Sequence, residues 1–211
     1  MDHRDARAGH LELHAERAVT RDRHLILVKH AMPQVDVETP AHEWRLHPEG
    51  EAGAVVLAER LVRAGYTPDR IVASVEPKAT QTGSIIAERL HLPFATVEGL
   101  HEHDRRAAGF LERKVFEARM HDLFAHPDQV VFGSESASAA LTRFTAAVDR
   151  VIKEDTGDGD VVIVTHGTVM SLFVAKRSHV DATSLWSTLG LPSYIALELP
   201  NYRIIEVVAT I

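Results

Sequence analysis

Two histidines each follow a short apolar stretch that is typical of a buried β-strand. Residues 24–29 read HLILVK and are followed by His30, and residues 160–165 read DVVIVT and are followed by His166. In an open α/β sheet, ligands bind at the carboxyl ends of the strands, which is where both histidines should lie. Either histidine alone is more commonly a hydrogen-bonded structural residue. Two of them at one edge, with Lys29 beside the first, predict a phosphate or anion site.

An imidazole at such a site can accept a phosphoryl group. The reaction needs a neutral ring nitrogen in line with phosphorus, cations against the equatorial oxygens and a proton donor for the leaving oxygen. His30 is the candidate nucleophile. A histidine with a pKa of about 6.5 has a useful neutral fraction at neutral pH, and a hydrogen bond to its second nitrogen would fix the tautomer.

The order of these segments resembles that of the histidine phosphatase superfamily, the phosphoglycerate-mutase-like enzymes. In that family the first strand ends in Arg-His-Gly or Arg-His-Ala, and a later strand ends in a second histidine. Two further segments lie between them here: residues 74–82, SVEPKATQT, look like the second phosphate-binding segment, and residues 100–105, LHEHDR, look like the acid segment. The resemblance covers most of residues 24–208.

The resemblance implies a role for each candidate residue. His30 would carry a transient phosphate, and His166 would be the second histidine of the phosphate pocket. Lys29 and Lys78 would bind the substrate phosphate, while Glu102 would protonate the departing alcohol and then activate water. The implied reaction is hydrolysis of a small phosphomonoester substrate, with no cofactor and no metal.

Lys29 and Lys78 stand where the family normally has arginines. Arginine grips two phosphate oxygens with a planar fork, whereas lysine is a strongly hydrated point charge, so both changes keep the charge and lose geometry. One alternative is therefore a catalytically degenerate protein that binds phosphorylated ligands or partners. Another is a mutase-type phosphotransferase, although the chain has no additional run of cations. Glu102 lies in a polar run and could instead belong to a solvated surface loop.

Other polar and aromatic residues have structural interpretations. Thr168 is most simply the N-cap of the helix that follows His166. The 14 histidines do not predict a metal site, because His42 with His47 and His101 with His103 lack zinc-enzyme spacing and the chain has no Cys. Thr80, Gln81 and Thr82 are interpreted as helix-face residues that shape the phosphate-binding segment. Four large apolar residues could line the substrate side, or could instead pack in the core or in loops: Trp44, Phe110, Leu111 and Phe116.

Composition bounds the class of protein. The chain has 211 residues, is 45% hydrophobic and carries a formal charge of -7, so it can bury a core but is a poor match for nucleic acid or an anionic membrane. The sequence contains no signal-peptide pattern and no apolar run of the roughly 18 residues needed to span a bilayer. These features favour a soluble, cytoplasmic protein and leave the oligomeric state open.

The apolar patterns predict an α/β fold, with a doubly wound, mostly parallel sheet, helices on both faces and a terminal hairpin. Residues 1–23 are interpreted as a charged N-terminal extension and residues 24–211 as a single histidine-phosphatase-like domain, in which residues 98–130 form a small helical cap insertion. The expected helices span residues 48–64, 77–90, 106–126, 134–154 and 168–176. Further strands are expected at residues 70–74, 94–97, 193–199 and 203–208.

Overall fold

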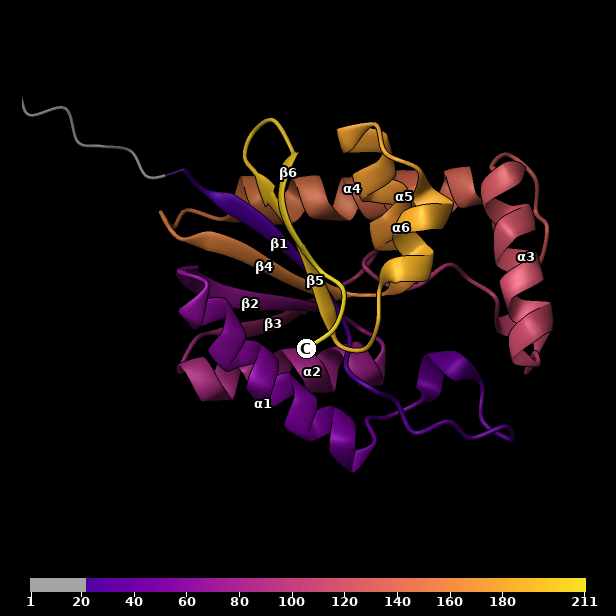
Figure 1. Cartoon of the computed structure of the whole chain (residues 1–211), viewed down its shortest axis with the longest axis horizontal. Helices are drawn as coiled ribbons and strands as arrows, with labels where there is room; N and C mark the ends of the chain where they lie inside the picture. The colour runs from indigo at the N-terminus through magenta and orange to yellow at the C-terminus, as the bar shows by residue number, and fades with distance from the viewer. Residues whose placement is uncertain (1–21) are drawn as a thin grey trace, which may run out of the picture.

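Six strands form one mixed sheet in the order β3-β2-β4-β1-β5-β6, in a computed structural model that describes residues 22–211. β3, β2, β4 and β1 pair in parallel, whereas β5 runs antiparallel to β1 and β6 antiparallel to β5. The predicted α/β fold with a terminal hairpin is therefore confirmed (Figure 1). The strands are β1 (His24–Lys29), β2 (Pro68–Ser74), β3 (Phe94–Val97), β4 (Asp160–Thr165), β5 (Ser193–Glu198) and β6 (Arg203–Val208).

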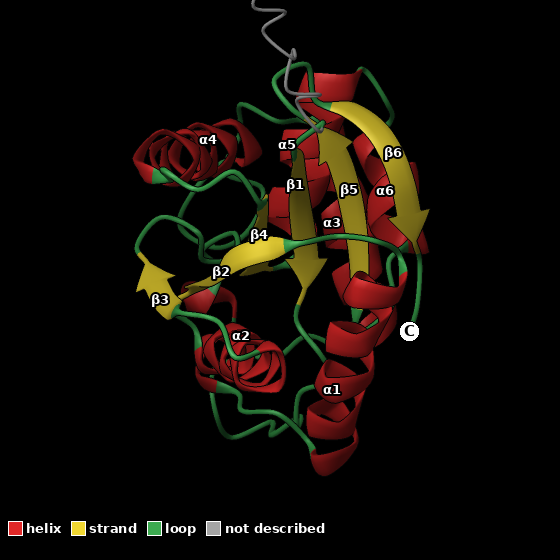
Figure 2. Cartoon of the chain, turned by 90° about the vertical axis from the view of Figure 1, so that its left-hand side faces the viewer, coloured by secondary structure: helices red, strands yellow, loops and turns green. Residues whose placement is uncertain are grey.

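Helices cover both faces of this sheet (Figure 2). α1 and α2 pack over Ile26 and Val162, while α4 and α5 pack over Leu25 and Ile163. Neighbouring residues of a strand point to opposite faces, so every residue of the central strand β4 is buried. The helices are α1 (Pro48–Arg63), α2 (Pro77–Leu90), α3 (Arg113–Ala125), α4 (Ala137–Glu154), α5 (Gly167–Ser178) and α6 (Ala182–Thr188), with 3-10 helices η1 (Ala41–Glu43) and η2 (Arg106–Ala108).

Parallel pairing of β1 with β4 sets the position of the two histidines. Lys29 lies opposite Thr165 in the strand register, and the backbone N–H of His30 donates to the carbonyl of Thr165 at 3.0 Å. Both strands therefore end at the same level of the sheet. In Figure 1 this edge faces the loop after β1 and the side on which α3 lies.

The loop after β1, residues 31–47, is fastened to α2. Thr82 Oγ1 accepts from the backbone N–H of Ala31 at 3.0 Å, and Gln81 Oε1 accepts from that of Leu46 at 2.8 Å. Thr80 Oγ1 donates instead to the carbonyl of Ser74. As expected, these three side chains shape the segment: Thr82 and Gln81 hold the two ends of the loop beside His30, and Thr80 ties the start of α2 to the end of β2.

The region predicted as a helical insertion, residues 98–130, contains η2 and α3. α3 is anchored on α6: the rings of Phe116 and Phe124 lie 5.9 and 6.2 Å from that of Trp186. α6 was not predicted from the sequence, although Asp181 caps it by accepting from the backbone N–H of Ser184. Because α6 lies in a distant segment, the packing of the insertion could not be predicted from residues 98–130 alone.

Three predicted helix starts were wrong. α3 begins at Arg113, and not at residue 106, where the 3-10 helix η2 lies. α4 begins at Ala137 with Ser136 as its N-cap, and not at residue 134. α5 begins at Gly167 with His166 at the N-cap position, so Thr168 lies inside the helix and is fully buried. Its role as N-cap was wrong because a carboxylate from another segment satisfies the first N–H groups of α5, as described below.

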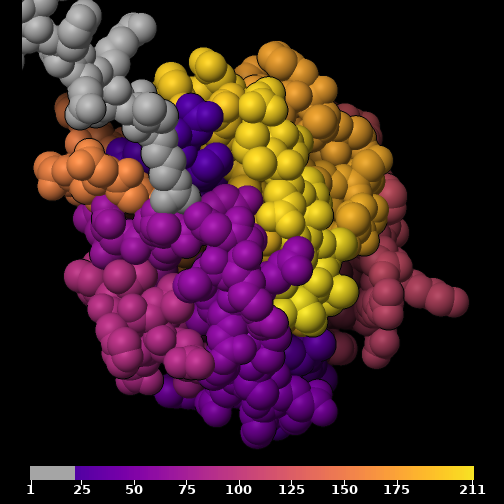
Figure 3. Space-filling model, turned by 60° about the vertical axis from the view of Figure 1, so that its left-hand side comes forward, coloured from indigo at the N-terminus to yellow at the C-terminus, as the bar shows by residue number. Residues whose placement is uncertain are grey.

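The C-terminal hairpin is tied to the α1 side of the sheet, and Figure 3 shows these residues (yellow) lying against the α1 region (purple). Glu206 accepts from the hydroxyls of Tyr66 and Tyr194 at 3.1 and 2.8 Å, and lies 3.4 Å from Arg60. The predicted extension at residues 1–23 falls almost wholly outside the described residues and stays a prediction. Within residues 22–211, no helix is both long and apolar enough to cross a membrane.

Gly50 offers a test of how α1 supports the loop beside His30. A Cβ at Gly50 would clash with the carbonyl oxygen of Met32, whereas a Cβ at Gly53 would meet only Pro192 Cδ, at 3.2 Å. Gly50→Ala should therefore lower the unfolding free energy by about 2 kcal/mol relative to Gly53→Ala, although both remove a helical glycine. Urea denaturation measures both, and equal stabilities would show that the loop yields without cost.

Candidate active site

The structure brings the two predicted histidines together. The ring centroids of His30 and His166 are 5.2 Å apart with an angle of 62° between the planes. His166 is fully buried, and His30 is only 7% exposed. Two histidines far apart would have favoured a purely structural role, so this proximity supports a shared site.

The hydrogen bonding of His30 defines its tautomer. Its Nδ1 lies 2.8 Å from the carbonyl oxygen of Ala31, which can only accept, so Nδ1 carries the hydrogen and Nε2 carries the lone pair. Burial lowers the pKa of His30 well below its usual value, and the charges of His166 and Lys78 lower it further. The ring is therefore neutral at neutral pH, as a nucleophile requires.

His166 is held by the second predicted segment. Its Nε2 lies 2.9 Å from the hydroxyl of Ser74 and 3.8 Å from a carboxylate oxygen of Glu76. Burial and the charge of Lys78 lower the pKa of His166 well below its usual value, against the opposing effect of Glu102. Ser74 and Glu76 were not predicted as site residues, although both lie within the recognised segment.

Lys78 is a buried cation with a fixed partner. Its Nζ donates to Glu76 Oε2 at 2.6 Å and to the carbonyl of Ala41 at 2.7 Å, and the residue is 6% exposed. A cation in the first turn of α2 opposes the helix macrodipole, and Glu76 at the N-cap position offsets that conflict. One of the three N–H groups of Nζ remains for a ligand.

Lys29 reaches the site from the end of β1. Its Nζ donates to the carbonyl of Leu189 at 2.7 Å, which leaves two N–H groups. The stem passes close to Gly167, where a Cβ would lie 3.1 Å from Lys29 Cε, so glycine allows this approach. Burial lowers the pKa of Lys29, whereas the charge of Glu102 raises it.

Glu102 occupies the N-terminus of α5. Its Oε2 accepts from the backbone N–H of Thr168 at 3.2 Å, and its Oε1 from those of Val169 and His103 at 3.3 and 2.9 Å. Burial alone would raise the pKa of Glu102, but Arg105, His166 and the His103 N–H lower it to about 2. Glu102 is thus buried and ionised, which excludes the solvated-loop alternative.

Arg105 is a cation that the sequence analysis left unassigned. Its Nη2 lies 3.7 Å from Glu102 Oε2, and its guanidinium lies 4.8 Å from the ring centroid of Phe116. Its charge lowers the pKa values of both Lys29 and His166. Nη1 is buried and has no hydrogen-bond partner among the described residues. Arg105 is the last residue of the recognised acid segment, but an arginine in a polar run carries no pattern that marks it as a site residue.

The acid segment is fixed from α4. Arg143 donates to the carbonyls of Gly99 and His101 at 2.9 Å and to that of Glu102 at 3.1 Å. Its guanidinium is held by Glu135 at 2.6 Å. Gly99 has a φ of 95°, a conformation that favours glycine. These contacts turn the chain after β3 so that Glu102 points at α5.

A sequence profile decides the family. The profile of the histidine phosphatase superfamily, branch 1, matches residues 25–205, which include both histidines, both lysines and Glu102. The chain belongs to this superfamily. No curated protein matches the sequence. The family assignment therefore stands on the profile.

Solved structures share the fold of this histidine phosphatase superfamily member. A mycobacterial hydrolase superimposes with a TM-score of 0.74 at 20% identity, covering 90% of this chain and 100% of the other. A mycobacterial glucosyl-3-phosphoglycerate phosphatase gives 0.72 at 21% identity, covering 90% and 100%. Phosphoserine phosphatase from Entamoeba histolytica, in complex with 3-phosphoglyceric acid, gives 0.69 at 17% identity, covering 89% and 98%. At these identities the likeness establishes the fold.

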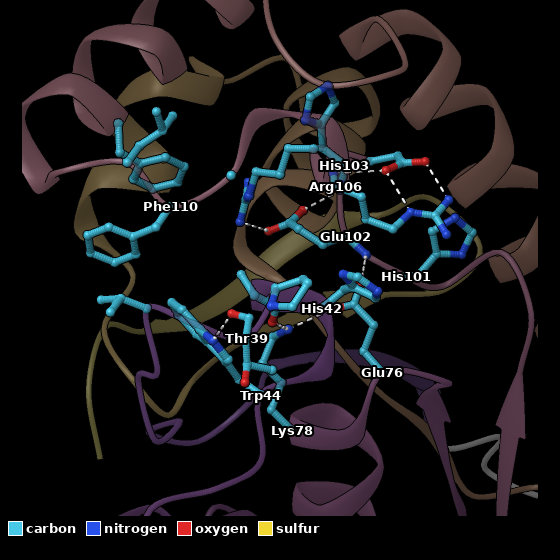
Figure 4. Close-up of a pocket in the computed structure, with 18 of the residues that line it drawn as sticks. Thr39, His42, Trp44, Glu76, Lys78, His101, Glu102, His103, Arg106 and Phe110 are labelled. Atoms are coloured by element: carbon cyan, nitrogen blue, oxygen red, sulfur yellow. Dashed lines mark hydrogen bonds and ion pairs between the residues drawn. The ribbon is translucent and has the colours of Figure 1, made fainter.

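A cavity of about 640 Å³ adjoins the site. Lys78, Glu76 and Glu102 line its inner side, whereas His30 and His166 are not in its lining. Figure 4 shows Phe110 on the opposite side of the view from Glu76 and His101. All four large apolar residues proposed for the substrate side lie in the lining: Trp44, Phe110, Leu111 and Phe116.

Acid should destabilise the protein through its buried neutral histidines. Because the pKa of His30 is lower in the folded chain than the usual value of about 6.5, the unfolded chain binds more protons as the pH falls below that value. The same holds for His166. Each should remove about 1 kcal/mol of unfolding free energy between pH 7.5 and 5.5, measured by urea denaturation.

The variant His30→Gln isolates one contribution, with His121→Gln as a control because His121 is exposed on α3. The pH-dependent loss should be smaller by about 1 kcal/mol in His30→Gln and unchanged in His121→Gln. An undiminished loss in His30→Gln would mean that His30 is not neutral in the folded chain.

Proposed function

We propose that this protein hydrolyses small phosphomonoesters through a transient phosphohistidine at His30. The observation that carries the proposal is the hydrogen bond from His30 Nδ1 to the Ala31 carbonyl, which leaves a neutral Nε2 with its lone pair. His166 lies beside this ring, and two lysines provide positive charge. Family membership and relatives that are phosphatases support the same reaction class.

In each step of the proposed reaction, every bond that forms is matched by a bond that breaks, and every proton has a donor and an acceptor in the site. His30 Nε2 attacks phosphorus, the bond from phosphorus to the alcohol oxygen breaks, and that oxygen takes a proton from Glu102. Water then attacks phosphorus, Glu102 takes a proton from it, and inorganic phosphate leaves as His30 is restored. The remaining N–H groups of Lys29 and Lys78 bind the equatorial oxygens. Nη1 of Arg105 can donate a further hydrogen bond to the phosphate. It belongs to a guanidinium, the planar group that neither lysine has.

Glu102 must gain a proton before it can act as an acid. In the structure it is ionised, with a pKa of about 2. A phosphate dianion bound beside it places a like charge next to the carboxylate, and like charges raise a carboxyl pKa. Phosphate also competes for the α5 N–H groups that Glu102 now occupies. Substrate binding therefore supplies the condition under which Glu102 becomes the proton donor.

A degenerate phosphate-binding protein is the second candidate. It is favoured by the ion pair between Lys78 and Glu76, which already neutralises one of the two lysines. The attraction of this pocket for a phosphate is then weaker than that of a pocket with two unpaired arginines. The net charge of -7 supports small phosphorylated ligands over nucleic acid or an anionic membrane in either case.

His30→Ala should abolish hydrolysis, because no other group can form the covalent intermediate. Turnover of 4-nitrophenyl phosphate should fall by at least about a thousandfold, while the far-ultraviolet circular dichroism stays unchanged. Incubation of the wild type with 32P-labelled acetyl phosphate and acid-labile labelling tests the nucleophile directly. The control is His121→Ala on α3, which should keep activity and label. A fully active, folded His30→Ala protein would refute the mechanism, and a wild type that binds phosphate but hydrolyses no phosphomonoester would favour the degenerate binder.

Glu102→Gln should separate substrates by their leaving groups. Glutamine still accepts hydrogen bonds from the α5 N–H groups but has no proton to transfer at neutral pH. Hydrolysis of ethyl phosphate should fall by about a hundredfold or more, and that of 4-nitrophenyl phosphate by less than about tenfold, because nitrophenolate leaves without protonation. The matched control is Glu88→Gln on α2. Equal losses for the two substrates would remove Glu102 from the acid role.

A further inference from the structure

Within the proposed function, on which this inference rests, the leaving alcohol must lie in the cavity beside Glu102. Lys78 contacts the phosphate and Glu102 protonates the leaving oxygen, and both line this cavity of about 640 Å³. An alcohol oxygen that lies between phosphorus and Glu102 directs its carbon chain into that space. The lining therefore selects the substrate, and we infer that the substrate is a phosphomonoester of an uncharged, largely apolar alcohol.

The outer wall of the cavity is apolar and accessible. Phe110 is 48% exposed, Val37 58% and Val75 38%, and all three line the space. Trp44 Nε1 donates to the carbonyls of Asp36 and Thr39 at 2.9 Å, so its polar edge is already used. Exposed apolar side chains that line a concave site mark contacts for an apolar ligand.

The cations of the lining are already paired with carboxylates. Lys78 Nζ lies 2.6 Å from Glu76, and Arg106 Nη2 lies 2.6 Å from Asp104. Arg105 lies 3.7 Å from Glu102, and its guanidinium lies over the ring of Phe116. Each of these three cations thus has a carboxylate partner in the lining, which offsets its attraction for a second anionic group on the leaving alcohol.

Two further carboxylates leave the cavity with an excess of negative charge. Glu38 and Glu98 line it in addition to the paired acids. Burial lowers the pKa of His101, another lining residue, so that its ring adds no positive charge at neutral pH. A carboxylate on the leaving group would be repelled here. The structurally similar phosphatase that binds 3-phosphoglyceric acid takes an acidic ligand, which this cavity opposes.

Three alkyl phosphates test the inference with the full chain. Hexyl phosphate and 5-carboxypentyl phosphate differ only at the far end of the chain, so their leaving oxygens have nearly the same reactivity, and ethyl phosphate lacks the apolar length. The expected kcat/KM for hexyl phosphate exceeds that for ethyl phosphate by roughly tenfold or more, because methylene groups leave water. The kcat/KM for hexyl phosphate should also exceed that for 5-carboxypentyl phosphate by roughly tenfold, because the carboxylates of the lining repel the terminal carboxylate of the substrate.

Two variants connect the preference to the wall. Phe110→Ala and Trp44→Ala should each lower the ratio of kcat/KM for hexyl phosphate to that for ethyl phosphate by roughly fivefold. Val62→Ala removes an exposed apolar side chain from α1, outside the cavity, and should leave this ratio unchanged.

The outcomes separate the two proposals. Equal kcat/KM values for the three alkyl phosphates would overturn the inference and leave the phosphatase assignment intact. If none of the three is hydrolysed and His30 is never labelled, the proposed function fails. In that case, calorimetric titration measures whether the cavity prefers an uncharged apolar chain in binding alone. Tighter binding of hexyl phosphate than of 5-carboxypentyl phosphate supports the inference, and equal dissociation constants overturn it.

Discussion

The parallel pairing of β1 with β4 is the constraint on which the site depends. The last hydrogen bond of this ladder, from the N–H of His30 to the carbonyl of Thr165, places both strand ends at one level. A shift of one residue in this register would turn alternate side chains to the opposite faces of the sheet and separate the histidine rings. The buried valines of β4, packed by helices on both faces, fix the register.

Burial of so much charge at one edge requires local balance. Two lysines and an arginine would repel one another without the carboxylates of Glu76 and Glu102. Glu76 pairs with Lys78 and accepts from the backbone N–H of Glu102, so one carboxylate links the two segments. Glu102 in turn caps α5 and lies near Arg105. In the proposed function, a phosphate would enter a site whose charges are already paired, and its binding would rearrange these pairs.

The lysines at positions 29 and 78 are not simple losses of arginine. Each donates to a backbone carbonyl, of Leu189 and Ala41 respectively, and each keeps at least one N–H group for a ligand. The guanidinium of Arg105 approaches the same site from the acid segment. In the proposed function, Arg105 would supply the phosphate with the planar donor group that neither lysine offers.

The sequence by itself predicted every strand and all the α-helices except α6, and it supplied the candidate residues. Periodicity in strongly patterned runs placed β3, β6 and α2 to the residue. The order of four motifs predicted a site made of His30, His166, Lys29, Lys78 and Glu102. Only the tertiary structure decided what depends on partners distant in the chain. The N-terminus of α5 is capped by Glu102 from 66 residues away, so local sequence misplaced the cap at Thr168. Three further features also depend on residues distant in the chain, so only the tertiary structure shows them. They are the ionised state of Glu102, the proximity of Arg105 and the apolar wall of the cavity.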